Sequence, residues 1–225
     1  LQAHPEAARP AGKLVVVAVG KAACAMAAGA LAQRSTDPDR VLVVTKEGHG
    51  GACPHGVGHT WETGHPLPDH RSLAAGEAVL GAVTDLGPED ELLLLISGGA
   101  SALLDVLPPG LAAEDWIAAH RALVGGGIPI QAINAVRKHL SRLKGGQLAR
   151  AAAPARVTAL HLSDVIGDDP AVIGSGLAAA DAATFDDALA VAAGVENFPP
   201  AVTDYLRQGA EGEGPPVPRP GSLEH

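Results

Sequence analysis

Four polar turns in this sequence carry residue types that bind anions or metal ions, and each turn directly follows a run of apolar residues. In chain order they hold Lys21, Lys46, Ser97, Gly98, Gly99, Ser101, Asp164, Asp168 and Asp169. Lysines neutralise phosphate, glycines let backbone N–H groups approach an anion closely, and carboxylates bind Mg²⁺ or accept a proton. Together they suit a site for phosphate, a metal ion and a small hydroxylated acid.

Lys21 and the 97–101 turn each have a functional and a structural interpretation. Lys21 stands at the predicted N-terminus of a helix, where a cation opposes the helix dipole and an anion is favoured. That mismatch favours a ligand-binding lysine over one that only begins the helix in solvent. The Ser-Gly-Gly turn suits an anionic group, although a short turn of this composition is equally often structural.

The carboxylates at 164, 168 and 169 follow the last predicted strand. One of the three could orient or deprotonate a hydroxyl, and Asp168 or Asp169 could bind Mg²⁺. The alternative is that Asp168 or Asp169 caps a helix before Pro170, and at least one is expected to do only that.

A basic stripe is predicted on the segment 131–146, which we interpret as one helix with Arg137, Ser141 and Lys144 on a single face. Such a stripe is either a solvated face or a wall that binds phosphate or carboxylate. Near the end of another strand, His65-Pro66 either faces a ligand or belongs to a rigid loop without chemical role.

The elements that position these turns alternate between strand and helix. Strands are predicted at 13–19, 41–45, 58–62, 91–97 and 156–162, and helices at 21–33, 69–86, 113–124, 131–146, 184–193 and 199–209. Continuous apolar runs suit a buried parallel sheet, whose carboxyl ends gather at one edge. We therefore predict an α/β fold, a three-layer Rossmann-like domain with a mainly parallel sheet flanked by helices.

Composition and charge limit what the core can be made of and which classes of partner the chain can bind. The 225 residues are 47% hydrophobic but only 2% aromatic, so the core must consist of Ala, Val and Leu. A net charge of −9 disfavours nucleic acid and anionic membranes as partners. Cys24 and Cys53 match no metal spacing or disulfide framework, which predicts a reducing, cytoplasmic location with Cys24 as a small core residue.

The ordered set of motifs at 19–23, 45–48, 64–66, 96–104, 134–146 and 163–170 resembles the amino-terminal domain of the glycerate 2-kinase family, also labelled hydroxypyruvate reductase. The resemblance implies ATP-dependent, Mg²⁺-dependent phosphorylation of D-glycerate to 2-phosphoglycerate, with a possible homo-oligomer. It implies catalytic roles for Lys21 and Asp164. Ala100 departs from the family pattern, in which a third glycine is usual.

The resemblance also implies a domain division. Residues 1–220 would form the amino-terminal domain, the smaller carboxy-terminal domain would be absent, and residues 221–225 resemble a vector-encoded tag remnant. The isolated chain is then expected to fold without being active. Two other functions remain open: an NAD(P)H-dependent hydroxypyruvate reductase, disfavoured because no Gly-x-Gly-x-x-Gly follows the first strand, and a non-catalytic sugar-acid binding module.

Overall fold

The computed structural model describes residues 11–34, 37–53, 58–213 and 217. Within them, five strands form one sheet: β1 (Leu14–Val19), β2 (Arg40–Lys46), β3 (His59–Thr63), β4 (Glu91–Ser97) and β5 (Arg156–Leu162). The predicted linker at 214–220 and the predicted tail at 221–225 lie outside the described residues, except for Val217.

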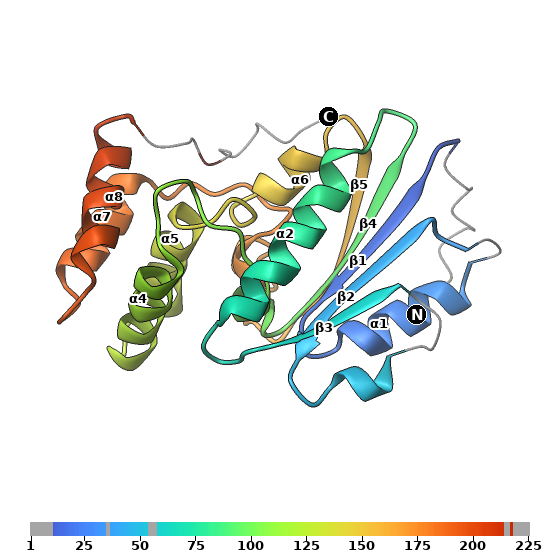
Figure 1. Cartoon of the computed structure of the whole chain (residues 1–225), viewed down its shortest axis with the longest axis horizontal. Coiled ribbons are helices and arrows are strands. Elements are labelled where there is room, and N and C mark those ends of the chain that lie inside the picture. Colours follow the sequence, from blue (N-terminus) through green and yellow to red (C-terminus); the bar gives the residue numbers. More distant parts are fainter. Residues whose placement is uncertain (1–10, 35–36, 54–57, 214–216, 218–225) are drawn as a thin grey trace.

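The sheet is parallel throughout, in the order β3-β2-β1-β4-β5 (Figure 1). Val19 at the end of β1 is in register with Val44 of β2 on one side and with Ile96 of β4 on the other. The strand order changes direction between β1 and β4, which is where open α/β sheets form a ligand-binding crevice. The predicted Rossmann-like α/β fold is confirmed.

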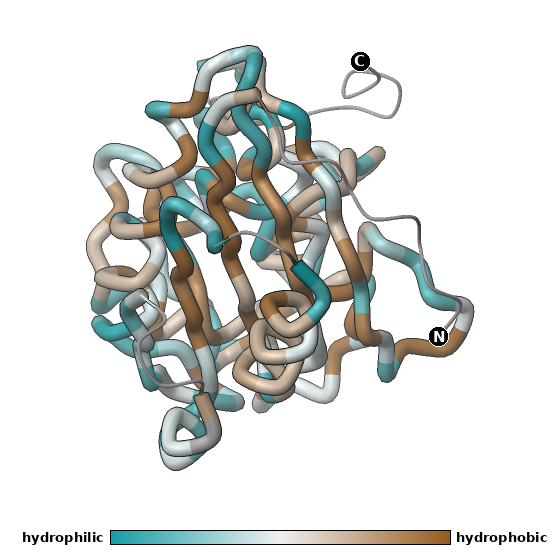
Figure 2. Tube along the Cα trace, turned by 90° about the vertical axis from the view of Figure 1, so that its right-hand side faces the viewer, coloured by the Kyte–Doolittle hydropathy of each residue, from teal (hydrophilic) through white to brown (hydrophobic). Residues whose placement is uncertain are grey.

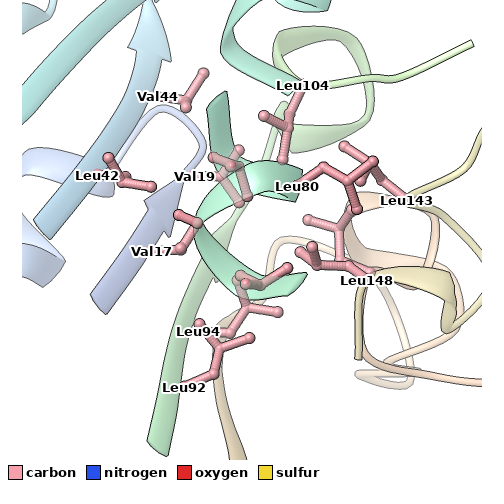
Figure 3. Packing of buried hydrophobic residues seen from close by; sticks show 14 of the residues in the cluster. Val17, Val19, Leu42, Val44, Leu80, Leu92, Leu94, Leu104, Leu143 and Leu148 are labelled. Atoms are coloured by element: carbon pink, nitrogen blue, oxygen red, sulfur yellow. The ribbon is translucent and has the colours of Figure 1, made fainter. Parts of the chain in front are cut away.

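Helices cover both faces of the sheet. The face with Leu14, Val16 and Ala18 packs on α1 (Ala23–Ala32), while the other packs on α2 (His70–Thr84) and α6 (Gln147–Ala152). Leucine and valine dominate the second interface (Figure 3), and hydrophobic strands run through the interior (Figure 2). Asp69 caps α2 in a capping box with Ser72, as its sequence position predicts.

A second hydrophobic cluster lies beside the sheet and was not predicted. It is formed by α4 (Ala113–Gly125), α5 (Ile130–His139), α7 (Phe185–Ala193) and α8 (Pro200–Ala210), and Figure 1 shows these helices together at one end of the molecule. Trp116 is fully buried in this cluster. The last two helices therefore close a helical core of their own with α4 and α5.

The prediction of one helix over 131–146 is wrong, because α5 ends at His139. The Ser141 hydroxyl accepts hydrogen bonds from the N–H groups of Leu143 and Lys144, which diverts the backbone into a turn. Gly145 and Gly146 then adopt positive φ values of 61° and 83°, and α6 begins after them. The short helices α3 (Ala100–Leu103), η1 (Gly50–Ala52) and η2 (Ile173–Ser175) complete the described elements.

The outer strand β5 is the least covered part of the sheet. Leu160 and Leu162 lie on the same face as Leu93 and Leu95 of β4, yet they are 49% and 54% exposed. Among the described residues, no helix is both long and apolar enough to cross a membrane.

Candidate active site

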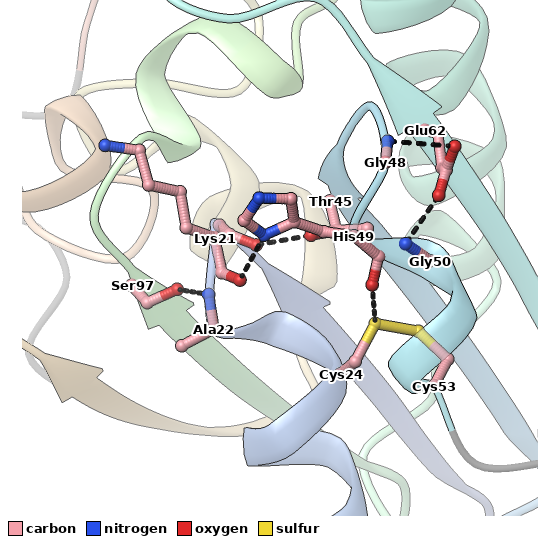
Figure 4. The surroundings of a disulfide bond; sticks show 11 residues. Lys21, Ala22, Cys24, Thr45, Gly48, His49, Gly50, Cys53, Glu62 and Ser97 are labelled. Carbon is pink, nitrogen blue, oxygen red and sulfur yellow. Dashed lines mark hydrogen bonds between the residues drawn. A yellow bond between two sulfur atoms is a disulfide. The ribbon is translucent and has the colours of Figure 1, made fainter.

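The turn after β1 is tied to the turn after β4 at the crevice. The Lys21 N–H donates to the Gly98 carbonyl over 2.9 Å, and the Ala22 N–H donates to the Ser97 hydroxyl over 3.1 Å. Ser97 is thus buried and engaged within the protein, so its hydroxyl joins two turns. Figure 4 shows the Lys21 side chain extending away from this contact and from α1.

Gly98 and Gly99 lie between the predicted catalytic groups. A Cβ on Gly98 would collide with the Asp164 carboxylate, and one on Gly99 would lie 3.1 Å from Cδ2 of His65 and 3.3 Å from Cε of Lys21. Gly99 also has a φ of +92°, a conformation that side chains disfavour. Lys21, Asp164 and the glycine turn therefore meet at one rim, as the sequence predicts, and His65 joins them.

Three cations act electrostatically on the His65 ring, and none of them forms an ion pair with a described residue: Lys21, Lys46 and Arg137. Burial lowers the pKa of His65, and the positive charges of those three side chains lower it further. His65 is accordingly neutral near pH 7, and the rim is positively charged although the chain as a whole is acidic.

Ser101 belongs to a buried polar chain beneath this rim. Its hydroxyl is 2.9 Å from that of Ser175, which donates to Oδ1 of Asn134 over 2.9 Å. Ser175 is buried and has a φ of 59°, which is uncommon for a residue other than glycine. The chain of contacts links the Ser-Gly turn to α5, which carries Arg137.

Lys144 does not join the rim. Its ammonium is fully buried, ion-paired with Asp105 and bonded to the Leu104 carbonyl over 3.0 Å. Burial lowers the pKa of Lys144 and raises that of Asp105, while the ion pair opposes both shifts. These contacts give Lys144 a structural role and do not support its prediction as an anion ligand.

The other predicted carboxylates lie further along the same loop. Asp169 accepts a hydrogen bond from the Ala171 N–H over 2.9 Å within a turn, no helix begins at Pro170 as the capping alternative required, and Asp168 is exposed with a φ of 51°. Among the described residues, no three His, Cys, Asp or Glu side chains gather into a metal-binding cluster. The Mg²⁺ assignment to Asp168 and Asp169 remains a prediction.

Cys24 and Cys53 form a disulfide, which corrects the expectation of two unrelated cysteines (Figure 4). The parallel return of the chain from β1 to β2 brings the loop after β2 against α1, a proximity that a spacing of 29 residues does not reveal. Cys24 is buried on α1, as predicted for a core residue. The same loop is held by Glu62, which accepts from the N–H groups of Gly48 and Gly50.

Comparison with known proteins places this site in a family. The model that matches residues 2–207 is described as "Domain of unknown function (DUF4147)". The chain belongs to the DUF4147 family. The match includes every residue that was predicted for the site.

Named relatives of this DUF4147 chain agree with the predicted resemblance to glycerate 2-kinases. It is 46% identical over 206 residues to a putative hydroxypyruvate reductase of Agrobacterium vitis, covering 90% of this chain and 46% of that protein. It is 42% identical over 179 residues to the D-glycerate 2-kinase of Thermotoga maritima, covering 80% and 43% respectively. The crystal structure of a Thermotoga maritima glycerate kinase superposes with a TM-score of 0.78 at 40% identity, covering 87% of this chain and 47% of that one. The DUF4147 chain therefore spans about half the length of these relatives.

Sequence reasoning missed two groups of this DUF4147 site. Asn134 was noted only as a neighbour of the basic stripe, and Ser175 only as part of a loop. Their burial and mutual hydrogen bond depend on η2 packing against α3 and α5, which no local pattern encodes. The proline after His65 was the available signal that this histidine is held rigidly at a strand end.

Proposed function

We propose that this chain carries the amino-terminal part of a kinase site that transfers the terminal phosphoryl group of ATP to D-glycerate, forming 2-phosphoglycerate. The supporting observation is that Lys21, Lys46 and Arg137, none of them ion-paired with a described residue, act on His65 beside the Gly98–Gly99 turn, with the Asp164 carboxylate against Gly98. Phosphoryl transfer needs mainly positioning and cations over the spreading charge, together with a carboxylate that orients the hydroxyl. The names of its DUF4147 relatives support the same reaction.

Each residue has a distinct proposed role. Lys21 and Lys46 hold phosphate oxygens from the solvent side, and backbone N–H groups of the glycine turn donate hydrogen bonds to an anionic oxygen. Asp164 is exposed and makes no hydrogen bond with a described residue, so its carboxylate is free to orient and deprotonate the glycerate hydroxyl. Ser101 supports the turn from below through Ser175.

The carboxylates after β5 could supply only one or two protein ligands to Mg²⁺. This ion is commonly held by one or two carboxylates together with substrate phosphates and water, and it would neutralise phosphate charge. Asp168 is suited to that, and so is Asp169 through the oxygen that does not accept from the Ala171 N–H.

Because the chain spans about half the length of its relatives, we propose that it supplies one wall of the site. We expect it to bind ligands but not to turn over alone, since closure around the substrate needs the remaining half. We also propose that the protein is cytoplasmic, where ATP is available, and that it forms a homo-oligomer.

The test is thermal stabilisation of the chain by ATP with Mg²⁺, by D-glycerate and by NADH, each added alone. The kinase proposal predicts stabilisation by the first two and none by NADH. Stabilisation by NADH, followed by its oxidation with hydroxypyruvate, would favour the reductase activity named for the Agrobacterium relatives. Stabilisation by D-glycerate without any effect of ATP would indicate the binding module.

A further inference from the structure

Arg137 is a buried arginine that pairs with none of the residues that the structure describes. Only 6% of the residue is exposed, its Nε atom has no hydrogen-bond partner, and the guanidinium forms no ion pair or hydrogen bond with a described residue. A guanidinium has five donors and remains charged, so leaving it buried and unsatisfied is costly. An arginine in this state is suited to bind an anion.

The nearby acid does not satisfy Arg137. Asp105 is close enough to favour the charged guanidinium, yet burial still lowers the pKa of Arg137. The Asp105 oxygens are taken by Lys144, by the Ser141 hydroxyl at 2.5 Å and by the Val106 N–H at 2.9 Å. The fold therefore completes the Asp105 cluster and leaves the arginine outside it.

Asn134 offers a second unused donor on the same side of α5. It lies three residues before Arg137, so the two side chains are neighbours on one face of the helix. Asn134 is 2% exposed, its Oδ1 accepts from Ser175, and its Nδ2 has no partner. Ser175 continues to Ser101, while the charge of Arg137 is felt at His65. Both unused donors thus adjoin the rim from its buried side.

We propose that Arg137 and Asn134 form the subsite that holds the carboxylate of the acid substrate, which leaves Lys21 and Lys46 for the phosphoryl group. This assignment rests on the proposed function and deepens it. A planar guanidinium fork matches a carboxylate in two parallel hydrogen bonds, and a buried subsite suits the part of the substrate that does not react. The exposed Lys21 is better placed for phosphates that enter from solvent.

The experiment measures binding of D-glycerate to the 225-residue chain by calorimetry, with glycerol as the neutral analogue and with inorganic phosphate and ATP titrated separately. Arg137→Lys keeps the charge but loses the fork, so D-glycerate should bind roughly 10- to 100-fold more weakly. Asn134→Ala should weaken it less, by roughly several-fold. ATP affinity should be unchanged in both variants, and glycerol should not bind detectably.

Tyr205→Phe is the matched control. The Tyr205 hydroxyl is also buried without a partner, but it lies in the helical cluster, so its removal should leave D-glycerate binding unchanged. Circular dichroism must show each variant folded, and Arg137→Gln provides a second substitution if Arg137→Lys does not fold.

Three results would overturn the assignment: D-glycerate affinity unchanged in folded Arg137 variants, D-glycerate binding absent from the chain even at tens of millimolar, or loss of phosphate affinity in place of glycerate affinity. The last result would assign the subsite to a phosphoryl group. The first and third results would leave the kinase proposal standing while ATP and D-glycerate still bind, whereas an unmodified chain that binds D-glycerate but not ATP would remove the kinase proposal and not the subsite.

Discussion

Two buried lysines of this protein form ion pairs with aspartates, whereas the three cations that act on His65 do not. Lys138 is ion-paired with Asp181 and Lys144 with Asp105, and both lysines are buried. Lys21, Lys46 and Arg137 have no such partner among the described residues, although the chain carries nine more acidic than basic residues. These three cations all act electrostatically on one histidine, His65, which is why we assign them to a ligand.

Lys21→Ala should lower the affinity of the chain for ATP by roughly tenfold, because it removes one charge-assisted contact to phosphate. Calorimetric titration of ATP measures this. Lys13→Ala is the matched control, since it removes a lysine just before β1, at the opposite end of that strand from Lys21. Equal ATP affinity in the Lys21 variant and the unmodified chain would contradict a phosphate-binding role.

D-glycerate should bind more tightly as the pH falls from 7.5 to 5.5. The pKa of His65 lies below its usual value, so the ring is neutral at pH 7.5 and gains a proton only at lower pH. A protonated ring adds a cation beside Lys21, Lys46 and Arg137, with Asp164 across the turn, while the substrate carboxylate stays ionised at a pKa of about 3.5.

Binding titrations at several pH values check this pH dependence. His65→Gln should remove it, and tighter binding at higher pH would show that the neutral ring is the binding form.

The sequence could predict which charged residues follow strands, because residue type and strand order are local information. It could not predict which of them are already satisfied. Lys144 and Arg137 were grouped as one basic stripe, yet one is neutralised by Asp105 and the other is not. Asp105, the acid that distinguishes the two cations, is 39 positions before Lys144 in the sequence, and only the folded chain brings Asp105 and Lys144 together.

The end of helix α5 determines where the side chains of the predicted basic stripe lie. Ser141 turns the chain after His139 and directs Lys144 inward, onto Asp105 and the Leu104 carbonyl. Hydrophobic periodicity alone predicts that the helix continues to residue 146, because the spacing of Leu140 and Leu143 is compatible with a helix. Strands and most helices were predictable from such patterns, whereas this turn depends on a buried polar group.

Lys144→Met should lower the free energy of unfolding by about 3–5 kcal/mol, because it leaves the Asp105 carboxylate buried without its counter-ion. Urea denaturation measures the change. The double variant Lys144→Met/Asp105→Asn should recover most of the loss, since an amide still accepts from Ser141 and Val106. A small effect of the single variant would mean that the pair is not buried as described.

At the scale of the whole molecule, a disulfide joins the first two βα connections of the sheet. It links Cys24 on α1 to Cys53 in the loop that begins at Lys46 and contains His49, whose ring nitrogen donates to the Lys21 carbonyl. The bond therefore fixes two loops that carry proposed phosphate ligands. Composition could not predict this, because two cysteines in an acidic chain are equally consistent with free thiols.

Reduction of the disulfide should lower the free energy of unfolding by about 3 kcal/mol, because it releases a closed loop between residues 29 positions apart. Denaturation with and without dithiothreitol measures this, and Cys24→Ser/Cys53→Ser should match the reduced protein and no longer respond to the reductant. Identical unfolding with and without reductant in the unmodified chain would indicate that the thiols are free.

The connection between the neighbouring strands β4 and β5 leaves the sheet, builds part of the helical cluster and returns. In this connection, Ile133 and Val136 of α5 pack with Trp116 and Leu123, while Asn134 of the same helix bonds to Ser175 and Arg137 acts on His65. A substitution that leaves a cavity beneath α5 should therefore shift this helix and weaken the binding of D-glycerate. Leu123→Ala should weaken D-glycerate binding in calorimetry as well as stability, whereas Leu31→Ala on α1 should affect stability alone.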